Sequence, residues 1–122
     1  MYPQELVEPM ENELVSRGFE ALRSAKEVDE VISKEGTTLM VVNSVCGCAA
    51  GSARPGVIYS LDNTKKPAHL ATVFAGVDRE AVEQARNYML PYPPSSPSIA
   101  LFKDGKLIKN VSLEEIRTRL AS

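Results

Sequence analysis

The sequence of 122 residues contains no tryptophan, one histidine and two cysteines, and its charges nearly cancel to a net charge of −2. Without an excess of basic residues, the chain lacks the positively charged surface that binds nucleic acids and anionic membranes, so we exclude both as partners. No stretch approaches the roughly 18 consecutive apolar residues of a membrane span. Residues 1–14 carry acidic side chains early and have no long apolar core, so we expect no signal peptide and a cytoplasmic protein.

The scarcity of cysteine makes the position of the two cysteines informative. Cys46 and Cys48 are separated only by Gly47, and they follow the apolar run "TTLMVVN" almost at once. In the cytoplasm lasting structural disulfides are rare, and paired cysteines more often serve catalysis or bind a metal. The cysteines of this chain therefore point to a single chemical site.

The order of the predicted elements indicates one α/β domain over residues 1–122. Helical patterns and strand patterns follow one another as helices 3–18 and 24–36, strand 37–43, helix 48–63, strand 69–76, helix 77–90, strands 98–103 and 106–111, and helix 112–121. The first two strands need a crossover helix, which makes them parallel, and the two-residue turn Asp104-Gly105 makes the last two antiparallel. We therefore expect a mixed four-stranded sheet flanked by helices, with an N-terminal helical extension.

The first helical segment has a recognisable apolar spacing. Leu6, Met10 and Leu14 recur four residues apart, which predicts that they form the buried face. Pro9 lies inside this pattern, and a proline interrupts the hydrogen bonds of a helix interior. We therefore expect a kink or a late helix start at Pro9.

Capping residues mark the starts of three later helices. Ser24 and Glu27 have the spacing of a capping box, as do Ser112 and Glu115. Asp78 stands directly before the apolar pattern of residues 79–90, where its side chain is expected to cap the helix.

The position of Cys46, between a strand end and a helix start, favours thiol chemistry. The attacking species is the thiolate, yet an unperturbed thiol with a pKa near 8.5 is only about 3% ionised at neutral pH. Lowering this pKa to about 7 requires about 2 kcal/mol of preference for the charged form. A helix amino terminus supplies about 0.3–1 kcal/mol, and up to about 2 kcal/mol where it is partly buried. Free amide groups of the first turn add hydrogen bonds, so Cys46 can be activated without a histidine.

The second thiol allows an adduct on the first to be resolved. A ring through Cys46, Gly47 and Cys48 needs an uncommon backbone shape, which glycine permits. Such a small ring is expected to be strained and therefore easily reduced. Its loop-closure contribution is only about 1.5 kcal/mol before strain is subtracted. The motif thus suits disulfide exchange better than permanent crosslinking.

Other readings of these residues remain open. Cys46 and Cys48 could be inert buried side chains, a metal-binding pair or a redox sensor. A structural zinc site needs four ligands, and His69 is the only imidazole, so a carboxylate or a second chain would have to complete it. We expect His69 to be a partly exposed strand residue rather than a base. Arg54 could bind an anionic substrate group and Tyr92 could line a groove, although surface and packing roles explain them as well.

Two further positions are candidates for binding. Pro97 immediately precedes the strand 98–103, and we predict a cis Ser96–Pro97 bond that leaves Ser96 to present its backbone to a substrate chain. Asn43, three residues before Cys46, is expected to shape the loop of the motif.

The stretches "VVNSVCGCAAGSARP", "TVFAG" and "PYPPSSPSIALFKDG" resemble the bacilliredoxin family, small bacterial proteins with a Cys-Gly-Cys motif. The resemblance covers almost the whole chain, and the strand order resembles the thioredoxin fold. The Cys-x-x-Cys motif that is usual in that fold is replaced here by Cys-x-Cys. This difference argues against simple thioredoxin-like reductase behaviour.

The resemblance implies a thiol–disulfide oxidoreductase that removes bacillithiol, a low-molecular-weight thiol, from mixed disulfides on client proteins. By this resemblance Cys46 attacks and accepts the bacillithiol, and Cys48 or free bacillithiol resolves the adduct. Pro97 matches the cis-proline that lies opposite the active site in the fold. Some relatives resemble disulfide isomerases. The implied co-substrate is bacillithiol, the implied partners are bacillithiolated client proteins, and no metal is expected.

Overall fold

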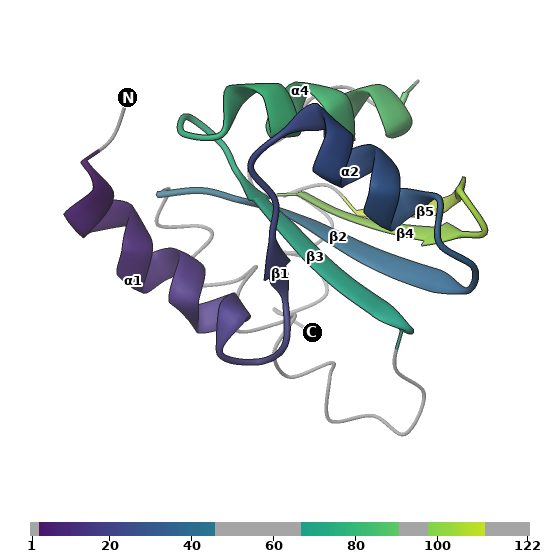
Figure 1. The fold of residues 1–122 in the computed structure, drawn as a ribbon, viewed down its shortest axis with the longest axis horizontal. Coiled ribbons are helices and arrows are strands. Elements are labelled where there is room, and N and C mark those ends of the chain that lie inside the picture. The colour runs from purple at the N-terminus through teal and green to yellow at the C-terminus, as the bar shows by residue number, and fades with distance from the viewer. Residues whose placement is uncertain (1–2, 46–66, 91–97, 112–122) are drawn as a thin grey trace.

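The structure is a computed structural model that describes residues 3–45, 67–90 and 98–111 (Figure 1). Its helices and strands are, in chain order, α1 (Gln4–Val15), β1 (Glu20–Ala21), α2 (Ala25–Ile32), β2 (Thr37–Asn43), β3 (His69–Phe74), α4 (Arg79–Tyr88), β4 (Ser98–Lys103) and β5 (Lys106–Val111). The predicted α/β class and the four predicted strands are confirmed.

The strands form one mixed sheet in the order β1-β3-β2-β4-β5. β2 is parallel to β3, and β4 is antiparallel to β5, as the connections predict. The sheet is completed by the antiparallel pairing of β2 with β4, which was not predicted. Asp104 and Gly105 form the turn with φ values of 50° and 84°, which a type I′ turn requires at both central positions. The fifth strand, β1, was not predicted. It is too short to show alternation, and it exists through its parallel pairing with β3.

One face of the sheet is covered by α2 and α4, which lie side by side across it (Figure 1). The two helices pack on alternate residues of the strands. The buried cluster on this face consists of Leu22, Val28, Val31, Ile32, Met40, Val42, Ala71, Val73, Ala81, Val82, Ala85, Met89, Ala100 and Phe102. This cluster is the main apolar core of the described part of the chain.

The other cluster is smaller and involves α1. Leu14 of α1 and Val41 of β2 are buried together with Phe19, which directly precedes β1. Because neighbouring strand residues point to opposite faces, Val41 lies on this face while Met40 and Val42 lie on the α2–α4 face. The prediction that this strand is buried on both faces is confirmed.

The buried face of α1 differs from the predicted one. Val7, Glu11 and Leu14 are buried, whereas Leu6 is 45% exposed and Met10 is partly exposed. The spacing of four residues was correct for a helix, but the helix is rotated so that Val7 replaces Leu6. A carboxylate, Glu11, consequently occupies a position inside the buried stripe.

The helix starts agree with the sequence in part. α1 begins at Gln4 and runs through Pro9, so of the two expectations for Pro9, a kink or a late start, the late start is wrong. The Ser24 hydroxyl accepts a hydrogen bond from the Glu27 backbone N–H at 3.2 Å, which confirms that cap. Asp78 does occupy the N-cap position of α4, but its side chain makes no capping hydrogen bond. Its carboxylate is engaged elsewhere, in the site described below.

Candidate functional site

Most of the predicted site residues lie outside the described residues. These are Cys46, Gly47, Cys48, Ser96 and Pro97, together with Arg54, Tyr92 and the predicted helices 48–63 and 112–121. The structure describes the chain up to Val45, directly before the motif, and again from Ser98, directly after the proline. It therefore fixes the points at which both segments join the sheet.

Both segments join the sheet at the same edge. In the antiparallel pairing of β2 with β4, Val42 stands opposite Ser98. The chain that enters the cysteine motif thus leaves β2 beside the point where the chain from Pro97 enters β4. β1 and β3 run parallel to β2, so their carboxyl ends lie at this edge as well. Open α/β sheets bind ligands at the carboxyl ends of their strands.

Asn43 is the last residue of β2 and is fully buried at this edge. Its side-chain Nδ2 donates to the backbone carbonyl of Met10 in α1 at 3.3 Å. Its Oδ1 accepts from the backbone N–H of Ser44 at 2.9 Å, and its own carbonyl accepts from the N–H of Ala75 at 3.0 Å. Asn43 thus connects three parts of the chain: α1, the residue after β3 and the start of the cysteine segment.

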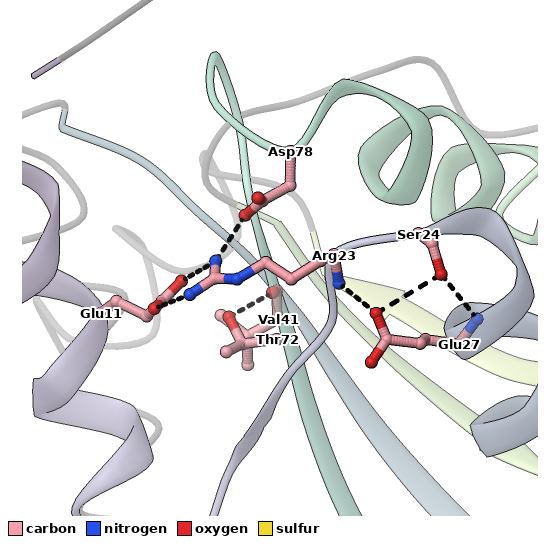
Figure 2. A network of polar contacts seen from close by, with 7 residues as sticks. All are labelled: Glu11, Arg23, Ser24, Glu27, Val41, Thr72 and Asp78. Carbon is pink, nitrogen blue, oxygen red and sulfur yellow. Dashed lines mark hydrogen bonds and ion pairs between the residues drawn. The ribbon is translucent and has the colours of Figure 1, made fainter. Parts of the chain in front are cut away.

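A network of three charged residues lies at the same edge (Figure 2). Arg23, which follows β1, binds Glu11 of α1 through two hydrogen bonds, Nη1–Oε2 at 2.7 Å and Nη2–Oε1 at 2.5 Å. Its Nη1 also donates to Oδ2 of Asp78, between β3 and α4, at 2.9 Å. The two carboxylates are about one tenth exposed, whereas the Arg23 side chain is 52% exposed.

The charge of Arg23 is neutralised within the network, in which two carboxylates outnumber the single guanidinium. The hydrogen bonds that Arg23 donates to Glu11, with the nearby charge of Asp78, raise the pKa of the Arg23 guanidinium. Burial raises the pKa of the Asp78 carboxyl above its ordinary value, and the attraction of Arg23 offsets this only in part. Because two carboxylates already share the guanidinium, Arg23 is poorly placed to bind an anionic substrate group.

A pocket of about 440 Å³ lies next to this network. Val7 and Glu8 of α1 line one side together with Glu11, and Val77 and Asp78 line the other. Arg23 lines it too, so the lining combines apolar groups with three carboxylates and one guanidinium, and negative charge prevails.

His69 is partly exposed, as predicted, and its Nε2 lies 3.0 Å from the carbonyl of Glu35. It begins β3, whereas Asn43 pairs with Phe74 at the other end of that strand. Five residues of strand span about 17 Å, so His69 lies far from the edge that leads into Cys46. This position argues against a role for His69 as the base of a Cys46 thiol.

Within the described ranges, no group of three or more His, Cys, Asp or Glu side chains could hold a metal ion. Both cysteines lie outside these ranges, so the metal-binding alternative stays untested. No helix in the same part of the chain is long and apolar enough to cross a membrane.

Sequence reasoning missed the roles of Glu11, Arg23 and Asp78. The available signal was the carboxylate at Glu11, which stands four residues after Val7 and three before Leu14. A charged residue in a buried stripe needs a partner of opposite charge. The signal could not be read because the stripe was placed one residue away, on Leu6.

Sequence comparison relates the whole chain to known proteins. A family model described as "Disulphide isomerase" matches residues 2–122. A bacilliredoxin of Cytophaga hutchinsonii is 58% identical over 121 residues, which cover 99% of this chain and 90% of that protein. A bacilliredoxin of Halalkalibacterium halodurans is 53% identical over 116 residues, which cover 94% of this chain and 81% of that protein.

Structural comparison finds thioredoxins among the similar folds. The thioredoxin of Fasciola hepatica matches with a TM-score of 0.58 at 20% identity, covering 84% of this chain and 95% of that one. The thioredoxin of Trypanosoma brucei brucei matches with a TM-score of 0.59 at 17% identity, covering 86% and 93%. At such low identity the comparison establishes the fold, and it confirms the predicted thioredoxin-like architecture.

Proposed function

Because the chain belongs to the bacilliredoxin family of thioredoxin-fold thiol–disulfide oxidoreductases, we propose that it removes bacillithiol from mixed disulfides on client proteins. The proposed site is the Cys46-Gly47-Cys48 motif, with Cys46 as the nucleophile. The proposed place of action is the cytoplasm, where the client proteins and the free thiol would meet. No metal takes part in this scheme.

The proposed reaction has two steps. The Cys46 thiolate attacks the bacillithiol sulfur of the mixed disulfide, the client thiolate leaves, and bacillithiol becomes disulfide-bonded to Cys46. The Cys48 thiolate then attacks the Cys46 sulfur, which releases bacillithiol as a thiolate and forms a Cys46–Cys48 disulfide. Alternatively, a second bacillithiol attacks the adduct and leaves as bacillithiol disulfide. In either case the mixed disulfide is reduced by two electrons, which the oxidation of the cysteine pair or of two bacillithiol molecules to a disulfide supplies.

The observation that carries the proposal is the convergence of the chain at one sheet edge. β2 ends at Asn43, three residues before Cys46, and its partner β4 begins at Ser98, one residue after Pro97. The segments on which the chemistry depends therefore leave the sheet as neighbours. This arrangement supports a role for Ser96 and Pro97 in binding the client chain beside the thiols, with Gly47 giving the motif its backbone freedom.

The deciding experiment is mass spectrometry of variants incubated with a bacillithiolated protein. In Cys48→Ser the resolving thiol is missing, so we expect a stable bacillithiol adduct on Cys46 together with release of the client thiol. Cys46→Ser is the matched control and should show no adduct on Cys48. If Cys48→Ser gains no adduct while the client stays modified, the proposed reaction is wrong.

Disulfide isomerisation is a second proposed activity, supported by the description of the matching family model. The same Cys46 thiolate would attack a non-native disulfide of a client and be displaced when a client thiol closes the native one. Refolding of a protein with scrambled disulfides should be faster with the wild type and unchanged with Cys46→Ser. Equal refolding with both proteins would contradict this activity.

A further inference from the structure

Hydrogen bonds connect the helix α1 to the carboxyl ends of the three parallel strands β1, β2 and β3. Two adjacent residues of α1 make the connections: the carbonyl of Met10 binds Asn43 at the end of β2, and the carboxylate of Glu11 binds Arg23 after β1. Arg23 in turn binds Asp78 beyond the end of β3 (Figure 2). These contacts converge at the edge from which the cysteine segment leaves the sheet.

The Asn43 side chain connects α1 directly to Ser44, at the start of the cysteine segment. One end of its amide donates to Met10 and the other accepts from the backbone of Ser44, which is 7% exposed. Cys46 is three residues from Asn43, so their Cα atoms lie within about 11 Å of each other. A buried amide with both ends bonded holds a fixed orientation, because any rotation leaves a buried polar group without a partner.

We propose that Asn43, held by α1, is a positioning residue that sets the reactivity of the Cys46 thiol. This inference rests on the proposed function and assigns part of it to the amino-terminal helix. By fixing the N–H of Ser44, Asn43 sets the direction in which the chain leaves β2. A change in that direction would move the segment that carries Cys46, and the pKa of a thiol depends on the hydrogen-bond donors around it. Glu11 supports the same arrangement through Arg23.

The proposal is tested by the pH dependence of Cys46 alkylation with iodoacetamide in a Cys48→Ser background. Asn43→Ala removes the side-chain hydrogen bonds to Met10 and Ser44, and we expect the thiol pKa to rise by about 0.5–1 unit, which for a parent pKa of about 7 lowers the alkylation rate at neutral pH about two- to fivefold. Glu11→Gln weakens the second connection and should shift the pKa in the same direction by less. This milder variant keeps the test valid if Asn43→Ala folds poorly.

Two controls separate positioning from general destabilisation. Glu5→Gln removes the same charge from an exposed position of the same helix and should leave the pH profile unchanged. Val82→Ala weakens the apolar core on the far face and should lower the melting temperature without moving the thiol pKa. If Asn43→Ala and Glu11→Gln both fold and both titrate like the parent, the positioning proposal is overturned while the proposed function stands. If the parent thiol itself reacts no faster than a model thiol, the proposed function fails instead.

Discussion

The two faces of the sheet are held by different kinds of interaction. On one face α2 and α4 bury a broad apolar cluster that includes Val42 and Phe102. On the other face, among the residues that the structure describes, α1 contributes Leu14 to a smaller cluster and is held at the site edge by hydrogen bonds and ion pairs. Burial is non-directional, whereas hydrogen bonds fix orientation. The comparison suggests that the α2–α4 face mainly supplies stability and that α1 mainly supplies geometry.

The largest loss of stability is expected on the α2–α4 face. Phe102 is 1% exposed and packs edge-to-face on Tyr88, with ring centroids 6.2 Å apart. We expect Phe102→Ala to lower the free energy of unfolding by about 3–5 kcal/mol, measured by urea denaturation. Phe102 pairs with Thr38, five residues from Asn43 along β2, so the thiol pKa of the folded fraction should not change. A changed thiol pKa in this variant would contradict the assignment of stability to the α2–α4 face and of geometry to α1.

A smaller loss is expected from the corresponding change on the α1 face. Leu14 is fully buried, and within the described ranges its cluster is smaller, with Phe19 and Val41 as the other buried members. We expect Leu14→Ala to cost about 2–3 kcal/mol, near the lower end for such a truncation. Unlike Phe102→Ala, it should also slow Cys46 alkylation at neutral pH, because α1 would be less firmly held. Unchanged alkylation would show that the apolar contacts of α1 do not reach the site.

Much of the fold could be predicted from the sequence, and the rest depends on tertiary contacts. The strands 37–43, 98–103 and 106–111 were predicted at their observed bounds because β-branched runs and the Asp104-Gly105 turn are local signals. β1 could not be predicted, because two residues carry no periodicity and pair only when β3 is already in place.

The site could be predicted only where chemistry is carried by residue type. Cys46 and Pro97 are candidate site residues because of their residue types and their positions next to predicted strands, and both lie outside the described residues. Asp78 was correctly placed before α4, yet its expected cap is replaced by the ion pair with Arg23. The two residues are 55 positions apart, and nothing local in the sequence reports their contact.

A still smaller effect is expected from the ion pairs of α1. Glu11→Gln should lower the free energy of unfolding by about 1 kcal/mol or less, because Arg23 is half exposed and keeps its contact with Asp78. A double-mutant cycle of Glu11→Gln with Arg23→Gln, measured by urea denaturation at low and high salt, isolates the coupling between the two side chains. The coupling should weaken in high salt. A coupling as large as the loss in Phe102→Ala would contradict the assignment of stability to the other face.

The smallest effect concerns pH and again belongs to the α1 side. Because burial raises the pKa of folded Asp78 above its unfolded value, the folded state binds this proton more readily. The ionised form therefore opposes folding above the unfolded pKa, and this cost disappears as the pH falls through the folded pKa. In Asp78→Asn the group no longer titrates. The stability of the wild type relative to this variant should thus increase on acidification from neutral pH toward the unfolded carboxyl pKa near 3.8.

The measurement is urea denaturation of both proteins across that pH range, with Glu80→Gln as a control that removes one carboxylate from the exposed first turn of α4. The direction in which the relative stability changes with pH tests whether burial or the attraction of Arg23 determines the Asp78 pKa. If Arg23 dominated over burial, the Asp78 pKa would be lowered, and the stability of the wild type relative to Asp78→Asn would decrease on acidification. Such a decrease would mean that the ion pair stabilises α1 by charge attraction. An increase means that a carboxylate is kept at this edge at a cost in stability, as expected if its contribution is to orient Arg23 and Glu11.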